Sequence, residues 1–128
     1  MKFNHVTIIV SELERSKAFY RDLGLEMIVD APPRYARFVV PGNEATFSIE
    51  VTEDAGPMGP NQAQIFFECD DLDERYEKLK AAGVQFHQAP TDMPYLWREA
   101  RLRDPDGHDI RLYRAGENRL NPPWRIRS

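Results

Sequence analysis

The chain has 128 residues, 41% hydrophobic and 11% aromatic, a composition typical of one globular domain that buries its own core. Seventeen Lys and Arg against 21 Asp and Glu give a net charge of −4 with both signs interspersed, which argues against nucleic-acid and polybasic membrane surfaces. No apolar run reaches the length of a membrane span, and the single cysteine, Cys69, is expected to be a buried thiol in a reducing cytoplasm.

The first half of the sequence carries strand and helix signals in the order βαβββ. Residues 3–10 (FNHVTIIV) are β-branched and apolar and predict a strand. Ser11, with Glu14 three residues later, has the pattern of a capping box that opens a helix. Gly24 predicts the end of that helix, because glycine readily adopts the left-handed conformation found there. Short strands are then expected near 25–29, 35–40 and 45–51.

The same signals then repeat. Residues 63–86 align without a gap on residues 4–27 at an offset of 59, which places Gly83 on Gly24. Further along, YARF (35–38) matches EARL (99–102), and SIEV (48–51) matches DIRL (109–112). A duplicated βαβββ unit is the simplest explanation of these matches.

The repeat divides the chain into four segments within one expected domain. They are a first module at 1–52, a Pro- and Gly-rich linker at 53–62, a second module at 63–115 and a C-terminal tail at 116–128. The tail holds Trp124 after two prolines, so we expect it to lie over the mouth of the site or against a partner subunit.

Side chains on a strand alternate between the two faces of a sheet, so each predicted strand can be divided by parity. One face is apolar and is expected to be covered by the helices; it holds Ile8, Phe47, Ile49, Phe67, Ala100, Leu102, Ile110 and Leu112. The other face is polar and aromatic; it holds His5, Arg37, Glu50, Gln64, Phe66, Trp97, Glu99, Arg101, Arg111 and Tyr113. Because sheets twist and curl, this second face predicts a concave site for a small molecule. A solvated sheet face is the alternative, which the large aromatic side chains disfavour.

Three segments resemble the glyoxalase/bleomycin-resistance/extradiol-dioxygenase (vicinal oxygen chelate) superfamily. NHVTIIVSELERSKAFYRDLGLE and FFECDDLDERYEKLKAAGV are similar to the openings of its two halves, and RLRDPDGHDIRLY is similar to its closing hairpin. The resemblance covers residues 1 to about 115. It implies an α+β fold in which two βαβββ modules form a curved mixed sheet, a cup or half-barrel, with the helices on the outer face. It also favours a homodimer.

The resemblance further implies where a metal would lie, because metal-binding members place ligands on the first and last strands of each half. Those positions hold His5, Glu50, Gln64 and Arg111 here. His5 and Glu50 are good ligands for Zn, Ni, Mn or Fe, whereas Gln64 is a weak one. Arg111 cannot coordinate a metal, because its guanidinium stays protonated.

Two interpretations of the site follow. In the first, His5, Glu50 and Gln64 hold a divalent metal, Arg111 orients an anionic group of the substrate, and Glu99 or Glu50 carries a proton.

In the second interpretation, Arg111 replaces the metal by pairing with Glu50. With Arg37 and Arg101 it then forms a cationic pocket for a carboxylate, a phosphate or a planar oxygenated ligand. That ligand would stack on the aromatic residues of the face, which are Phe66, Trp97 and Tyr113.

The leading functional hypothesis is a glyoxalase-like enzyme acting on a small oxygenated metabolite by lyase, isomerase or dioxygenase chemistry. The alternative is a metal-free protein of the bleomycin-resistance type that binds and sequesters a planar compound. The remaining histidines, His87 and His108, are expected on the surface, His87 at the end of a short strand and His108 in a turn.

Overall fold

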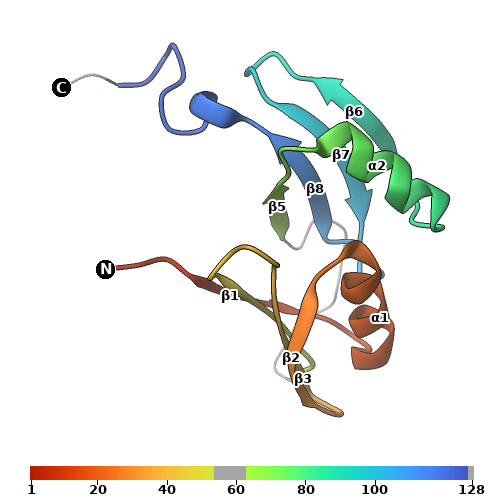
Figure 1. Cartoon of the computed structure of the whole chain (residues 1–128). Helices are drawn as coiled ribbons and strands as arrows, with labels where there is room; N and C mark the ends of the chain where they lie inside the picture. Colours follow the sequence, from red (N-terminus) through yellow and green to blue (C-terminus); the bar gives the residue numbers. More distant parts are fainter. Residues whose placement is uncertain (54–62, 127–128) are drawn as a thin grey trace. The chain divides into compact units, whose positions relative to one another are not determined.

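The computed structural model describes residues 1–53 and 63–126, and it divides into two compact units (Figure 1). The first unit comprises Met1–Ala63 with Asp104–His108, and the second comprises Gln64–Arg103 with Asp109–Ser128. Most of the predicted linker, residues 54–62, lies outside the described residues, as do residues 127–128 of the tail. Within the described residues, no helix is long and apolar enough to cross a membrane.

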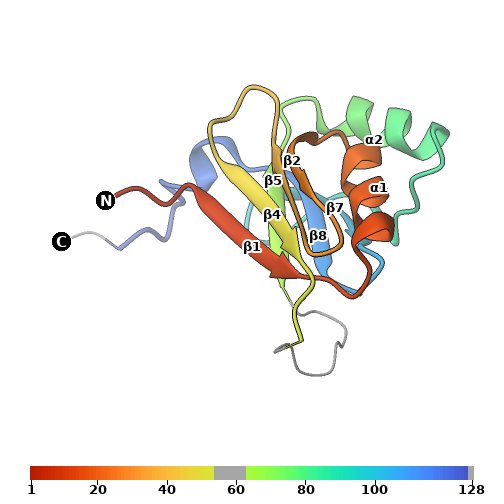
Figure 2. The same ribbon diagram turned by 90° about the horizontal axis from the view of Figure 1, so that it is seen from below.

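The first unit contains one mixed sheet and one α-helix. Its elements are β1 (His5–Ile9), α1 (Leu13–Leu23), β2 (Glu26–Ala31), β3 (Tyr35–Val39) and β4 (Thr46–Glu50). The strand order is β1-β4-β3-β2, with β1 parallel to β4 and the other pairs antiparallel. Figure 2 shows β1 and β4 side by side, and α1 packs on β3 and β4.

The second unit repeats this topology. Its elements are β5 (Gln64–Glu68), α2 (Leu72–Ala81), β6 (Gln88–Asp92), β7 (Arg98–Arg103), β8 (Asp109–Arg114) and the short 3-10 helix η1 (Gly116–Asn118). The strand order is β5-β8-β7-β6, with β5 parallel to β8, and α2 packs on β6 and β8. The predicted α+β fold with a duplicated βαβββ module is confirmed.

The apolar faces of both sheets are buried, as the parity of the strands predicted. The buried apolar strand residues include Ile8, Phe38, Phe47 and Ile49 in the first unit and Ala100, Leu102, Ile110 and Leu112 in the second. Phe67 of β5, which was expected on this face, is only half-buried. Tyr20 of α1 and Leu72 of α2 are each 0% exposed. Each large apolar side chain buried in this way stabilises its unit by about 1.5–3 kcal/mol relative to an exposed one.

Strand registers determine which positions of the two sheets correspond. His5 pairs with Thr46 in the first sheet, and Gln64 pairs with Asp109 in the second. Because His5 and Gln64 open equivalent strands, Thr46 corresponds to Asp109, and counting two residues on, Ser48 corresponds to Arg111.

The predicted match of SIEV with DIRL is therefore wrong by two residues. Glu50 pairs with Ile9, and Tyr113 pairs with Glu68, so Glu50 corresponds to Tyr113 and not to Arg111. The match of YARF with EARL is confirmed, because Tyr35 pairs with Glu50 as Glu99 pairs with Tyr113.

The start of α1 differs from the prediction. The helix begins at Leu13 with Glu12 as its N-cap, and no side chain caps it. The hydroxyl of Ser11 instead donates to Asp106 at 2.5 Å, and its backbone N–H donates to the same carboxylate at 3.1 Å. The predicted capping box is wrong, because a charge-assisted hydrogen bond to a carboxylate is stronger than a bond to a backbone N–H. The predicted helix end is confirmed, with Gly24 at φ 113°.

The two end residues of the turn at Asp104–His108 are buried in the first unit. Tyr20 donates its hydroxyl to Asp104 at 2.7 Å, and the His108 Nε2 lies 2.7 Å from the carbonyl oxygen of Ile9. His108 is 2% exposed, so the prediction of a surface turn residue is wrong. His87 is exposed as predicted, but it precedes β6, which begins at Gln88.

Candidate ligand-binding site

The polar face of the second sheet gathers charged and aromatic side chains from β5, β7 and β8. Arg111 pairs with Phe66 on one side and with Arg101 on the other, and Tyr113 pairs with Glu99. Paired residues of neighbouring strands project from the same face of a sheet. The structure therefore brings together these predicted site residues of the second half.

A buried carboxylate lies at the centre of this face. Glu99 is 0% exposed, and the Tyr95 hydroxyl lies 2.8 Å from each of its oxygens and donates to them. Arg101 and Arg111 each donate an N–H to Oε2 at 3.2 Å. A buried charge is tolerated when cations and hydrogen-bond donors satisfy it, and Glu99 meets that condition through three neighbours.

Arg111 is held by two carboxylates of its own unit. Its Nε and Nη2 donate to Asp109 at 3.3 and 2.9 Å, and its Nη1 donates to Glu99. Hydrogen bonding to Asp109, above all, raises the pKa of Arg111, so the guanidinium stays charged. Sequence reasoning expected Glu50 as its partner; the ion pairs are formed with Glu99 and Asp109 instead.

Arg101 keeps one hydrogen-bond donor unused. Its Nη2 pairs with Glu99, but its Nε is buried and has no hydrogen-bond partner in the described part of the chain. A buried N–H without an acceptor is costly, and a ligand oxygen placed at this face would satisfy it.

Four aromatic rings stand beside the charged cluster. The ring centroids of Trp97 and Tyr113 are 4.8 Å apart, at an interplanar angle of 34°. The Phe66 ring lies edge-on to both, with its centroid 5.8 Å from that of Trp97 and 5.5 Å from that of Tyr113. Tyr95 meets Trp97 edge-on at 5.8 Å, and the Arg111 guanidinium lies 5.1 Å from the centre of the Phe66 ring. Tyr113 is buried and the other three rings are half-buried. Such rings beside fixed guanidinium groups suit the flat face of an anionic ligand.

Sequence reasoning missed Tyr95 and the role of Asp109. Tyr95 lies in the turn between β6 and β7, where the alternation of strand side chains does not apply. Asp109 precedes Arg111 by two residues on β8 and therefore shares its face, a signal that was present in the sequence.

The polar face of the first sheet carries a different set of contacts. The two ring nitrogens of His5 lie 2.5 Å from the Thr46 hydroxyl and 3.1 Å from the Thr7 hydroxyl. The Tyr35 hydroxyl lies 2.6 Å from the Ser48 hydroxyl and accepts a hydrogen bond from Arg37 Nε at 2.9 Å.

Glu50, on the same face, is half-buried, and its side-chain carboxylate has no hydrogen bond to any residue that the structure describes. It is therefore a carboxylate available to a ligand or a proton.

The residues of the first unit do not fit a metal centre held by His5 and Glu50. The two side chains project from one face, but Glu50 pairs with Ile9, four residues beyond His5 on β1. At the rise of a strand this separates their Cα atoms by about 13 Å. The imidazole and the carboxylate would both have to lean along the sheet toward each other to share an ion about 2 Å from each ligand atom. The corresponding last-strand positions hold Ser48 and Arg111, a hydroxyl and a guanidinium. Among the residues described, no group of three or more His, Cys, Asp or Glu could hold an ion.

Comparisons with known proteins agree with this fold. The model of the glyoxalase/bleomycin resistance protein/dioxygenase superfamily matches residues 2–112. A relative from Bacillus subtilis, YetH, is 29% identical over 108 residues, covering 80% of this chain and 89% of its own.

Solved structures give the same result. A superfamily member from Sphaerobacter thermophilus is 31% identical with a TM-score of 0.71, covering 89% of this chain and 97% of its own. A bleomycin-binding protein complexed with bleomycin has a TM-score of 0.71 at 20% identity, covering 89% and 98%. The resemblance seen in the repeated segments is thereby confirmed, and the chain belongs to the glyoxalase/bleomycin resistance protein/dioxygenase superfamily.

Proposed function

We propose that the chain binds a small, planar, anionic molecule on the polar face of the second sheet, without a metal ion. The observation that carries this proposal is the guanidinium pair of Arg101 and Arg111, fixed by the buried Glu99 beside an aromatic wall. The unpartnered Nε of Arg101 supplies a donor for a ligand oxygen. Support also comes from a bleomycin-binding protein complexed with bleomycin, which has a similar fold.

The chemistry of the site favours binding over metal catalysis. Arg111 occupies a position where metal-binding relatives are expected to carry a ligand, and its guanidinium cannot coordinate. Glu99 already accepts hydrogen bonds from three residues, which suits it to holding the arginines in place. We therefore assign Glu99 a positioning role and give the ligand contacts to Arg101, Arg111 and the rings.

Fluorescence titration with salicylate, a planar oxygenated anion, tests this function. The Trp124→Phe background leaves Trp97 as the sole tryptophan and reporter. We expect saturable quenching, and at least a tenfold weaker affinity in Arg111→Gln, since a hydrogen bond to a charged group contributes about 1.5–3 kcal/mol. Arg21→Gln, an exposed arginine of α1, is the matched control and should leave the affinity unchanged. Equal affinities in Arg111→Gln and the background, or no saturable binding of salicylate, would remove the proposal.

A glyoxalase-like enzyme is the second candidate, and Glu50 is the observation that favours it. This half-buried carboxylate has no hydrogen-bond partner among the described residues, so it could take a proton from a small oxygenated substrate. Turnover of 2-oxoaldehyde or catechol substrates that disappears in Glu50→Gln would support this candidate. If Glu50→Gln still binds salicylate and no variant turns over these substrates, the enzyme candidate is removed and the binding function is the one that is supported.

We also propose that the chain forms a homodimer and is cytoplasmic. The family resemblance favours a homodimer, and the exposed Leu120, Trp124 and Ile126 of the tail support an apolar contact there. Sedimentation velocity of the full chain, compared with Trp124→Ser, tests the dimer. A cytoplasmic location is supported by Cys69, a buried free thiol.

A further inference from the structure

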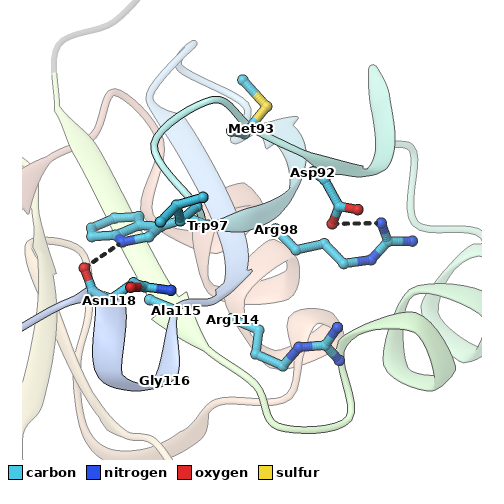
Figure 3. Close-up of a pocket in the computed structure, with 9 residues that line it drawn as sticks. Asp92, Met93, Trp97, Arg98, Arg114, Ala115, Gly116 and Asn118 are labelled. Atoms are coloured by element: carbon cyan, nitrogen blue, oxygen red, sulfur yellow. Dashed lines mark hydrogen bonds and ion pairs between the residues drawn. The ribbon is translucent and has the colours of Figure 1, made fainter. Parts of the chain in front are cut away.

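The second unit has a pocket next to the turn between β6 and β7 (Figure 3). It has a volume of about 510 Å³ and is bounded by the turn between β6 and β7, the start of β7, the end of β8 and η1. Ligand pockets of proteins have volumes of roughly 300–1,000 Å³, so this one could hold a small organic molecule.

One wall of the pocket is apolar and contains an unusual leucine. Leu96 is 47% exposed and has φ 68°, within the left-handed region that glycine adopts most easily. It is the third residue of a three-residue turn closed by a hydrogen bond from Met93 N to Trp97 O at 2.8 Å. Glycine is the favoured residue at that position of such a turn. An exposed leucine there adds apolar surface to the wall formed with Met93 and Trp97.

The opposite wall is fixed by hydrogen bonds. Glu68 accepts from the backbone N–H groups of Ala115 and Gly116 at 2.9 and 3.2 Å. The Trp97 indole donates to the carbonyl oxygen of Asn118 at 3.1 Å, a contact drawn in Figure 3. A wall held in this way needs little rearrangement when a ligand enters.

Two arginines face the pocket, and they differ in their partners. Arg98 donates to Asp73 through Nε and Nη2 and to Asp92 through Nη1, so its charge is matched by two carboxylates. The side chain of Arg114 forms no hydrogen bond or ion pair with any residue in the described ranges, and it is exposed. Its charge still acts on the Asp73 carboxylate, whose pKa is lowered first by the hydrogen bond from Arg98 and to a smaller extent by the charge of Arg114. The guanidinium of Arg114 is therefore available for bidentate binding of an anion.

We propose that this pocket binds a monocarboxylate with an aromatic or branched aliphatic body. Arg114 binds the carboxylate, and the body packs against Trp97, Met93 and Leu96. The site shares Trp97 with the polar face but uses Arg114 in place of Arg101 and Arg111, so the protein would carry two anion sites on different guanidinium groups.

Titration of the ¹⁵N-labelled full chain with 3-phenylpropionate tests this site. We expect saturable shifts of the amide signals of Leu96, Ala115 and Gly116, and at least a tenfold weaker affinity in Arg114→Gln. The uncharged analogue 3-phenylpropan-1-ol should bind to the unmodified protein at least tenfold more weakly than 3-phenylpropionate. The control variant Arg21→Gln should bind 3-phenylpropionate with the same affinity as the unmodified protein. Leu96→Gly removes the apolar side chain while relieving its backbone conformation, so binding should weaken although the fold is retained.

Three outcomes would overturn the assignment. The first is an unchanged affinity in Arg114→Gln, and the second is equal binding of the acid and the alcohol. The third is a set of shifts confined to Phe66 and Arg111, which would place the ligand on the polar face instead. In each of these cases, a loss of salicylate affinity in Arg111→Gln would still support the site on the polar face. The two proposals can therefore fail separately.

Discussion

Glu99 is a buried carboxylate that is satisfied by two guanidinium groups and one phenol on the polar face of the second sheet. Removing one partner from a buried ionic network is costly, because the charges left behind are still out of water. An ion pair on the surface contributes far less, because water solvates the partner that remains. Single arginines of this unit should therefore differ in their contribution to stability according to the burial of their carboxylate partners.

We predict that Arg111→Gln lowers the free energy of unfolding by about 2–4 kcal/mol, because it leaves the buried Asp109 without its cation and Glu99 with Arg101 alone. The matched change Arg98→Gln should cost under about 1 kcal/mol, because Asp73 and Asp92 are 52% and 84% exposed. Urea unfolding at pH 7 measures both values. Equal losses in the two variants would contradict the account of the buried cluster.

A second prediction concerns Cys69, whose thiol is buried on the second unit. Burial, the largest cause, raises the pKa of Cys69 from 9.0 to about 11. At pH 8 its thiolate fraction is then about a hundredfold smaller than that of an unshifted thiol. Alkylation by iodoacetamide, followed by mass spectrometry, should be slower by about that factor in the native protein than in urea.

The pH dependence of stability follows from the same shift. The unfolded chain ionises its thiol from about pH 9, whereas the folded chain retains the proton until about pH 11. The free energy of unfolding should therefore fall over this range, and Cys69→Ala should reduce the fall. Native alkylation at the rate of the unfolded chain would contradict a buried thiol.

At the scale of elements, the turn Asp104–His108 is tied to α1 and β1 by polar contacts. Tyr20 is 0% exposed, and burial together with the charge of Asp104 raises its pKa, so its hydroxyl remains a donor to that carboxylate. Tyr20→Phe should lower the free energy of unfolding by about 1–3 kcal/mol and increase hydrogen exchange at His108, whose N–H donates to Asp104.

Tyr76→Phe provides the control for that change. Tyr76 is half-buried and contacts Phe86 and Lys80 through its ring, which phenylalanine retains. We expect a change within about 0.5 kcal/mol. If Tyr20→Phe also changed the free energy of unfolding by no more than about 0.5 kcal/mol, the hydrogen bond from its hydroxyl to Asp104 would not stabilise the turn.

The elements also show what sequence reasoning could predict. Strand alternation placed Glu99, Arg101 and Arg111 on one face, because side chains of a strand change face at every residue. The same alternation could not reveal the misaligned SIEV segment, since a slip of two residues leaves every side chain on its original face. The contact of Ser11 with Asp106 joins residues 95 apart, so local helix signals could not predict it.

For the whole molecule, the duplicated segments predicted the fold and the family, and both are confirmed. The predicted metal set of His5, Glu50 and Gln64 was transferred from a pattern of strand positions. Strand registers now assign the last-strand positions to Ser48 and Arg111, neither of which supplies a carboxylate or an imidazole. The sequence alone could not predict these registers, because a register depends on pairing between strands that are distant in the chain.

In this account, guanidinium groups, and not a metal ion, bind the anionic ligand of this protein. Isothermal titration of the full chain, stripped with EDTA, with Zn²⁺, Ni²⁺, Mn²⁺ and Fe²⁺ tests it most directly. We predict no saturable binding of any of the four ions, with His5→Ala and Glu50→Ala indistinguishable from the unmodified protein. One ion bound per chain, and lost in both variants, would contradict the claim.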